Sequence, residues 1–244
     1  AFARHGRPDI GLVSMSEVAD TVALMRERVA LPLIVDIDTG FGNALNVQRT
    51  VRVFERAGAS ALQMEDQLMP KRCGHMAGKQ VISASEMVGK IKAALDARHD
   101  ADTLLIARTD ALGVTGFDDA LDRAEQYLQA GADALFIEAP NSIEQMQQIT
   151  ARFVGRIPLV HNLVEGGGSP VGDAATLEQL GYRIALYPAA LLHLFVPQAQ
   201  ALLAHIHLHG STTGYAGLID LNRINAVLGA PELLATAARY GAET

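Results

Sequence analysis

The sequence predicts an α/β fold of the (β/α)8 barrel type, in which parallel strands alternate with helices. Short apolar or β-branched runs are followed by longer amphipathic stretches, and this alternation repeats along most of the chain. The strand-like runs are apolar nearly throughout, as expected when both faces of a parallel sheet are covered by crossover helices. The length of 244 residues is close to that of one such barrel.

The strand-like runs are residues 31–39, 60–66, 103–109, 134–139, 157–163 and 184–188. The helix-like stretches are residues 16–29, 46–57, 85–98, 118–130, 143–153, 174–180 and 191–208. An eight-stranded barrel needs two further strands, and we expect one of them near residues 9–13 or upstream of Ala1. A doubly wound open sheet is the alternative fold.

The end of the sequence differs from the rest, because residues 219–244 are helix-like with no strand between them. We expect one or two helices in this region, which contains a Gly-Ala-Pro break at residues 229–231. We therefore expect one α/β-barrel domain spanning residues 1–244. The barrel occupies about residues 1–210, and a helical extension occupies residues 211–244.

Composition excludes several classes of partner. The net charge is −7 and no Lys/Arg stripe is visible, so neither nucleic acid nor an anionic membrane surface is expected as a partner. The longest apolar runs are too short and too interrupted to span a bilayer. One cysteine allows no intrachain disulfide, which is typical of a reducing compartment and predicts a cytoplasmic location.

Polar side chains follow the strand-like runs at the point where each run ends. They are Asp36, Asp38, Glu65, Asp66, Arg108, Asp110, Glu138, Asn162 and Tyr187. In a parallel barrel the carboxyl ends of all strands meet at one rim, where such barrels hold their active sites. The acidic members concentrate negative charge that needs a partner. Arg108 supplies one, and Mg²⁺ supplies another because it prefers carboxylate and water oxygens.

The second candidate feature is the segment Pro70-Lys71-Arg72-Cys73-Gly74-His75-Met76, within a long polar connection at residues 67–83. Long connections inside compact domains are often binding loops. A single cysteine is most often a buried core residue, but this one lies among cations, which favour its thiolate. From the residues alone, Cys73 is a nucleophile, an acid/base group, a redox sensor or a structural residue.

Taken together, these motifs resemble the isocitrate lyase and 2-methylisocitrate lyase branch of the phosphoenolpyruvate mutase superfamily, with dimethylmalate lyase-like members most similar. The resemblance covers nearly the whole chain. Its motifs, in order, are Asp36-Ile-Asp38-Thr-Gly, Glu65-Asp66-Gln67, Lys71-Arg72-Cys73-Gly74-His75, Ala107-Arg108-Thr109-Asp110, Glu138-Ala139, Asn162-Leu-Val-Glu165 and Tyr187-Pro188.

The resemblance implies roles for individual residues. It implies a Mg²⁺ site, also open to Mn²⁺, whose ligand is Asp38, assisted directly or through water by Asp36 and Glu65. It also implies that Cys73 is the catalytic acid/base group. The remaining residues with an implied catalytic or substrate-binding role are Lys71, His75, Arg108, Gly74, Glu138 and Asn162. Finally, it implies that the last helix exchanges between subunits, giving a homodimer or homotetramer.

The implied reaction is the retro-aldol-type cleavage of a small 2-hydroxy di- or tricarboxylate, of the 2-methylisocitrate, isocitrate or dimethylmalate type, to a 2-oxo acid and a second carboxylate. Methylisocitrate lyases have an Arg after the Tyr-Pro pair where this chain has His193, which favours a dicarboxylate. An oxaloacetate hydrolase or decarboxylase is one alternative. A non-catalytic barrel is another, because the family's Tyr-x-Ser-Gly carboxylate-binding segment does not precede Gly6 in this sequence.

Overall fold

The structure, a computed structural model, describes residues 1–74 and 76–241. It divides into two compact units, Ala1–Ala190 and Leu191–Thr244. The first unit contains all of the strands in the described residues, and the second is helical.

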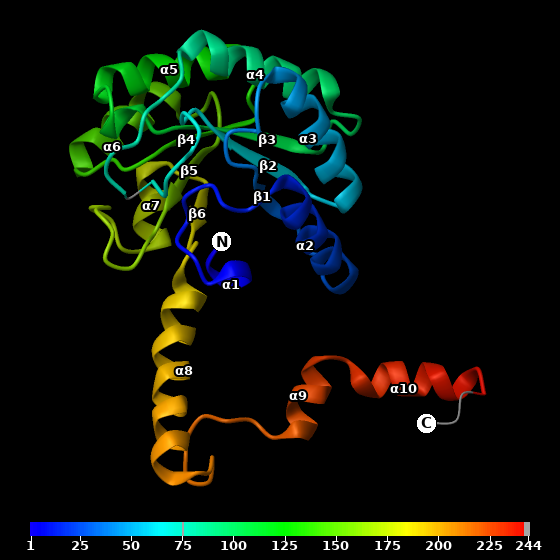
Figure 1. Ribbon diagram of the computed structural model, residues 1–244. Helices are drawn as coiled ribbons and strands as arrows, with labels where there is room; N and C mark the ends of the chain where they lie inside the picture. Colours follow the sequence, from blue (N-terminus) through cyan, green and yellow to red (C-terminus); the bar gives the residue numbers. More distant parts are fainter. Residues whose placement is uncertain (75, 242–244) are drawn as a thin grey trace. The chain divides into compact units, whose positions relative to one another are not determined.

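The first unit is built on one curled parallel sheet (Figure 1). Its strands in the described residues are β1 (Ile34–Asp36), β2 (Ala61–Glu65), β3 (Leu104–Thr109), β4 (Ala134–Ile137), β5 (Leu159–Asn162) and β6 (Ile184–Leu186). Each pairs in parallel with the next strand in sequence, so that β1 and β6 are the two edges of the described sheet. A doubly wound sheet would reverse its strand order. The sequential order therefore confirms barrel-type winding, in which the described strands form an open part of a barrel.

Helices connect successive strands and cover the outer face of the sheet (Figure 1). The connecting helices are α3 (Ala44–Ala57), α4 (Ala84–Ala97), α5 (Phe117–Gln129), α6 (Ile143–Phe153) and α7 (Ala174–Leu180), with a 3-10 turn η1 (Ala111–Gly113) before α5. Two helices, α1 (Phe2–His5) and α2 (Met15–Arg28), precede β1. Several begin at a polar residue whose side chain accepts a backbone N–H of the first turn, such as Ser14, Asn43 and Asp173. Such caps satisfy amides that have no partner within the helix.

Hydrophobic side chains are buried on both faces of the sheet, as the apolar strands predict. The larger cluster lies between the sheet and the outer helices and includes Phe54, Tyr127 and Phe153, each 0% exposed. A smaller cluster packs on the other face, and its largest member is Phe136. The guanidinium of Arg108, near the end of β3, lies over the ring of Phe136 in this cluster.

The structure excludes one of the two positions suggested for a further strand, and it shortens one predicted strand. Residues 9–13 form bends and not a strand, because their backbone contacts a loop instead: the Asp9 carbonyl accepts the Cys73 N–H at 3.0 Å. The first strand is also shorter than predicted and ends at Asp36. Asp38 has a φ of 49°, in the left-handed region, which turns the chain away from the sheet.

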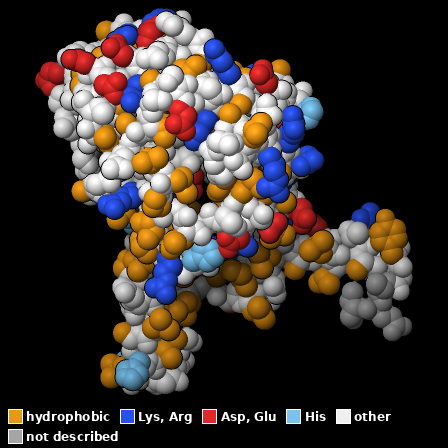
Figure 2. Space-filling model, turned by 45° about the horizontal axis from the view of Figure 1, so that its top comes forward, with side chains coloured by type: hydrophobic (Ala, Val, Ile, Leu, Met, Phe, Trp, Pro, Cys, Tyr) orange, Lys and Arg blue, Asp and Glu red, His pale blue; other side chains and the backbone are white. Residues whose placement is uncertain are grey.

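The second unit contains most of α8 (Ala190–His209), followed by α9 (Leu221–Val227) and α10 (Ala230–Arg239). Its described helical residues include none that is buried, and many large hydrophobic side chains are exposed on them. Figure 2 shows these hydrophobic side chains at the surface of the α8 segment. In the described part of the chain, no helix is both long and apolar enough to cross a bilayer.

Candidate active site

A cavity of about 470 Å³ opens at the carboxyl ends of the strands in the first unit. It brings together every predicted site residue that the structure describes. These are Asp36, Asp38, Glu65, Lys71, Cys73, Gly74, Arg108, Glu138 and Asn162. The remaining predicted residue, His75, lies outside the described residues. The predicted residues at the strand ends and those in the loop thus meet at one cavity, which is the candidate site.

Lys71 is the central cation on the acidic side of the cavity. Its buried ammonium lies 2.8 Å from an Asp38 carboxylate oxygen and 2.7 Å from one of Asp9. Burial lowers the pKa of Lys71, but the nearby carboxylates of Asp36, Glu65 and Asp38 raise it above its ordinary value. Lys71 is therefore charged. Sequence reasoning gave Asp9 no role, although it lies in the Gly-x-Pro-Asp-x-Gly stretch near the start of the chain.

Asp38 and Asp36 form a compact turn beside Lys71. The Asp38 N–H donates to an Asp36 carboxylate oxygen at 3.0 Å. Burial raises the pKa of Asp38 to about 6, and the Asp36 charge adds to the rise, while Lys71 opposes it. Both residues line the cavity. The strand ends at Asp36, so Asp38 reaches the cavity through its left-handed turn and not as part of the strand.

Glu65 is the most deeply buried acid of the cavity wall and is 1% exposed. One of its oxygens, Oε2, lies 3.4 Å from Arg108 Nε, whereas Oε1 has no hydrogen-bond partner among the described residues. Burial raises the pKa of Glu65 well above its ordinary value, and Arg108 only partly opposes this. A buried oxygen without a partner is costly, so Glu65 is open to a cation or a proton.

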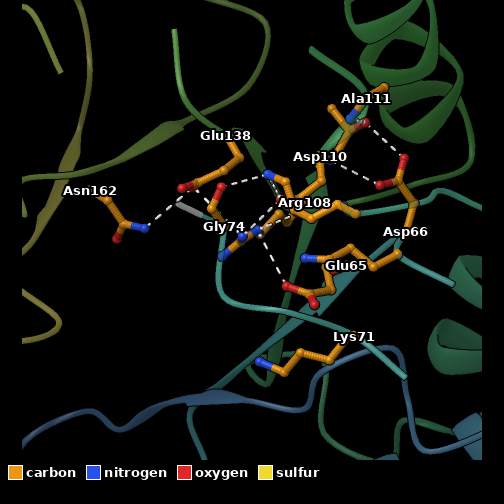
Figure 3. Close-up of polar contacts among 12 residues, drawn as sticks. Glu65, Asp66, Lys71, Gly74, Arg108, Asp110, Ala111, Glu138 and Asn162 are labelled. Atoms are coloured by element: carbon orange, nitrogen blue, oxygen red, sulfur yellow. Dashed lines mark hydrogen bonds and ion pairs between the residues drawn. The ribbon is translucent and has the colours of Figure 1, made fainter. Parts of the chain in front are cut away.

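Arg108 lies between carboxylates at the centre of the site, as Figure 3 shows. Its Nε and Nη2 donate to the two Asp110 oxygens at 2.8 and 3.1 Å, and Nη2 lies 3.9 Å from Glu138 Oε2. Its guanidinium also lies 5.1 Å from the centre of the Phe136 ring. Such a two-point pairing fixes the plane of the guanidinium. The sequence placed Asp110 at the strand end but did not identify it as the anchor of Arg108.

Gly74 brings the backbone of the loop against this centre. A Cβ at this position would lie 2.4 Å from Arg108 Nη2 and 2.5 Å from Glu138 Oε1, so no larger side chain fits without a shift. Next to it, the half-buried Cys73 lines the same cavity. On the far side, Asn162 donates to Glu138 Oε2 at 3.3 Å.

A buried network behind the cavity holds the ends of β2 and β3 together. Asp66, which is 0% exposed, accepts hydrogen bonds from the Thr109 and Tyr127 hydroxyls, each at 2.7 Å, and from the Asp110 N–H at 2.9 Å. Arg123 Nη1 lies 3.3 Å from the same carboxylate. Figure 3 shows Asp66 on the side of Asp110 away from Glu138. This network sets the position of Asp110 and, through it, that of Arg108.

The chemistry of the cavity wall fits a hard divalent cation. Among the described residues that line it, five carboxylates face two cations: Asp9, Asp36, Asp38, Glu65 and Glu138 against Lys71 and Arg108. Within the described residues no three acidic, histidine or cysteine side chains form a ready-made metal cage. Mg²⁺ does not need one, because it keeps several waters and takes only one or two protein carboxylates directly.

Comparison with known proteins assigns this arrangement to a family. The family model described as phosphoenolpyruvate phosphomutase matches residues 1–207. The chain is 48% identical over 189 residues to 2,3-dimethylmalate lyase of Eubacterium barkeri, covering 78% of this chain and 65% of that protein. It is 45% identical over 199 residues to 2-methylisocitrate lyase of Aeropyrum pernix, covering 82% of this chain and 63% of that protein. The matched region thus spans somewhat less than two thirds of these relatives.

Solved structures agree with the sequence comparison. A crystal structure of 2,3-dimethylmalate lyase superposes with a TM-score of 0.93 at 32% identity, covering 99% of this chain and 80% of that one. Oxaloacetate acetylhydrolase with the inhibitor 3,3-difluorooxalacetate gives 0.93 at 31% identity, over 100% and 82%. Phosphonopyruvate hydrolase with oxalate and Mg²⁺ gives 0.86 at 32% identity, over 98% and 83%. Because the family model matches most of the length of this chain, the chain belongs to the phosphoenolpyruvate phosphomutase family, within the superfamily that also contains the isocitrate lyases.

Proposed function

We propose that this protein is a magnesium-dependent carbon–carbon lyase that cleaves a small 2-hydroxy di- or tricarboxylate to a 2-oxo acid and a second carboxylate. The observation that supports it best is a single cavity that combines an acidic wall, the fixed guanidinium of Arg108 and the thiol of Cys73. The two relatives described above are both named as lyases of such acids. A dicarboxylate of the dimethylmalate type is the preferred substrate, because His193 replaces the Arg expected for a tricarboxylate.

The acidic wall is the proposed binding place of the metal. Asp38, with Asp36 and Glu65, would hold Mg²⁺ or Mn²⁺, which when bound supplies Lewis-acid stabilisation for the oxygens of the substrate. Two features support this assignment: the excess of carboxylates on the wall, and Glu65 Oε1, which has no hydrogen-bond partner among the described residues. Lys71 contributes a fixed positive charge to the same wall, through its contacts with Asp38 and Asp9.

The other side of the cavity binds the half of the substrate that leaves and stabilises its charge. The 2-hydroxyl group gives its proton to a base in the cavity, and its oxygen forms the C=O bond of the 2-oxo acid. As the bond between C2 and C3 breaks, the electron pair of that bond moves onto the departing fragment, which becomes a carboxylate enolate. Arg108 faces this charge with a guanidinium already oriented by Asp110, so that little reorganisation is needed during the reaction. Cys73 then donates the thiol proton to the carbon. Glu138, Asn162 and the Gly74 backbone shape the pocket around the fragment.

A substrate panel tests the proposal directly. Purified protein with Mg²⁺ is offered dimethylmalate, 2-methylisocitrate, isocitrate and oxaloacetate, and both 2-oxo acid and oxalate are measured. We expect 2-oxo acid from at least one hydroxy acid and none after chelation of the metal. If no hydroxy acid is cleaved but oxaloacetate yields oxalate, the hydrolase named among the structural neighbours is the better assignment. Release of neither product indicates a non-catalytic barrel.

The Cys73→Ser variant tests the role of the proton donor independently of the metal site. We expect cleavage to fall by about 100-fold or more, because general acid catalysis contributes about 10²–10⁴-fold. Mg²⁺ affinity, measured by calorimetry, should stay unchanged, whereas Asp38→Asn should weaken it. Wild-type turnover in Cys73→Ser would remove Cys73 from the mechanism.

We also propose that the protein is a homo-oligomer, a dimer or a tetramer, assembled through the second unit. Leu194 and Phe195 are 61% and 65% exposed on α8, and exposed apolar surface of this kind marks protein interfaces. Sedimentation velocity should therefore show an assembly that Phe195→Asp weakens. Leu45→Asp is the matched control, because Leu45 is 74% exposed on α3 of the first unit. A wild-type protein that sediments as a monomer at all concentrations contradicts the proposal.

A further inference from the structure

Lys79 is a buried cation that does not line the cavity, yet it joins a residue of the cavity lining, Gly74, to Asp110, which orients Arg108. Its Nζ lies 2.6 Å from the Gly74 carbonyl oxygen and 2.7 Å from Asp110 Oδ1, and its side chain is 6% exposed. Both contacts are charge-assisted hydrogen bonds, which are shorter and stronger than neutral ones. One nitrogen atom thus connects the backbone of the loop to the end of β3.

At the β3 end, Lys79 binds the residue that orients Arg108. Asp110 is 0% exposed, and its two oxygens accept from Arg108 Nε and Nη2 as well as from Lys79. Its backbone N–H is held in turn by Asp66. These bonds restrain Asp110 together with Arg108. The Asp110 carboxylate is therefore a fixed attachment for the Lys79 ammonium.

At the loop end, Lys79 holds the residue that touches the reacting centre. Gly74 packs against Arg108 and Glu138 so closely that a Cβ would meet both below 3 Å. Cys73 is its direct neighbour in the chain. The start of the loop is held separately, by Lys71 on Asp9 and Asp38 and by Gln67 on the Arg72 backbone. Lys79 supplies the corresponding attachment after Cys73.

We propose that Lys79 is a positioning residue, which holds Cys73 and the Gly74 backbone at a set distance from Arg108 by bridging the Gly74 carbonyl to the Asp110 carboxylate. This role rests on the proposed lyase function for its catalytic consequence. Without Lys79, Arg108 keeps both of its bonds to Asp110, so substrate binding should change little. The proton donor, in contrast, loses its attachment, so the chemical step should suffer.

The test compares Lys79→Met with a matched control, Arg98→Met. Arg98 makes the same kind of bridge at the opposite end of the strands, donating from Nη1 to the Asp133 carboxylate at 2.7 Å and to the Thr103 carbonyl at 2.8 Å. Both variants remove a cation that joins a carboxylate to a carbonyl, and only one of them lies beside Cys73. Thermal unfolding confirms that each variant is folded. If Lys79→Met does not fold, Lys79→Gln replaces it.

The first measurement does not depend on catalysis. Cys73 is the only cysteine of the chain, so its rate of alkylation by iodoacetamide reports the position of the loop. Loss of the bridge should raise this rate by about tenfold in the Lys79 variant and leave it unchanged in Arg98→Met. Equal rates in wild type and the Lys79 variant would overturn the proposal, even if the protein proves to cleave no hydroxy acid.

The second measurement uses the substrate identified by the panel. In Lys79→Met, kcat should fall by about 10- to 100-fold while KM stays within about threefold of wild type, as expected when a reacting group is misplaced by about 1 Å. Arg98→Met should keep the wild-type kcat. A Lys79 variant that loses thermal stability as Arg98→Met does, with an unchanged kcat, has only a structural role and contradicts the proposal.

Discussion

Gly74→Ala is the substitution for which the structure supports the most detailed prediction. The added Cβ would lie 2.4 Å from Arg108 Nη2, whereas ordinary contact begins at 3.4 Å, so one side must move by about 1 Å. Arg108 is held by two bonds to Asp110, and Glu138 is 2% exposed and accepts from Asn162. The less buried loop backbone should therefore yield, carrying Cys73 with it.

A displacement of about 1 Å in a catalytic group lowers activity by about 100-fold, equivalent to about 2.7 kcal/mol of transition-state stabilisation. We expect kcat/KM for release of the 2-oxo acid to fall by this factor in Gly74→Ala. Global stability, measured by urea unfolding, should fall by no more than about 2 kcal/mol, because the shift strains the one hydrogen bond from Lys79 to the Gly74 carbonyl and leaves the pair of Arg108 and Asp110 intact.

Gly89→Ala is the control for adding a methyl group. Gly89 is exposed within α4, and a Cβ added there would meet no described atom within 4 Å, so alanine should raise stability by about 0.5–1 kcal/mol and leave kcat/KM unchanged. Wild-type kcat/KM in Gly74→Ala would refute the reasoning, because it would mean that the loop backbone does not need to lie against Arg108 during the reaction.

Further predictions concern charge, packing and metal. The pKa of Asp110 lies at about 2, because Arg108 and Lys79 outweigh the effect of burial, so its stabilising contribution is present above about pH 4 and lost as the pH falls towards about 2. The difference in unfolding free energy between wild type and Asp110→Asn should accordingly shrink by about 2 kcal/mol over that range in urea titrations. Asp66→Asn should destabilise the protein by about 3 kcal/mol or more, because an amide NH₂ would face the buried donors that now bind the carboxylate; a loss below about 1 kcal/mol would contradict this. Gly40→Ala should cost about 2 kcal/mol, since its φ is 84° and the new Cβ would lie 2.4 Å from Val47 Cγ2, and an unchanged urea midpoint would argue against the packing. Mg²⁺ at about 100 times its Kd should stabilise the wild type by about 2.7 kcal/mol in thermal-shift assays, chelation should reverse this, and an equal shift in Asp38→Asn would exclude Asp38 as a ligand.

The order of elements and the location of the candidate site could be predicted from the sequence alone. Hydrophobic periodicity is a local property of the chain, so helices and strands appear in it directly. Parallel strands also share a direction, so residues that end different strands must meet at one rim. Glu65, Arg108 and Glu138 were found in this way, although they are far apart in the sequence. The Cys73 loop was recognised because its residues are contiguous.

The pairing of charges within the site depends on tertiary packing. Lys71 binds Asp9 across more than sixty residues of chain, and Lys79 bridges Gly74 to Asp110. No periodicity encodes such contacts, because they depend on how a loop folds back over the sheet. The left-handed turn at Asp38 is a second example, since the sequence predicted that residue to lie within a strand that ends at Asp36. The sequence thus determines the groups that meet at the rim. The packing of distant segments determines the pairs that these groups form.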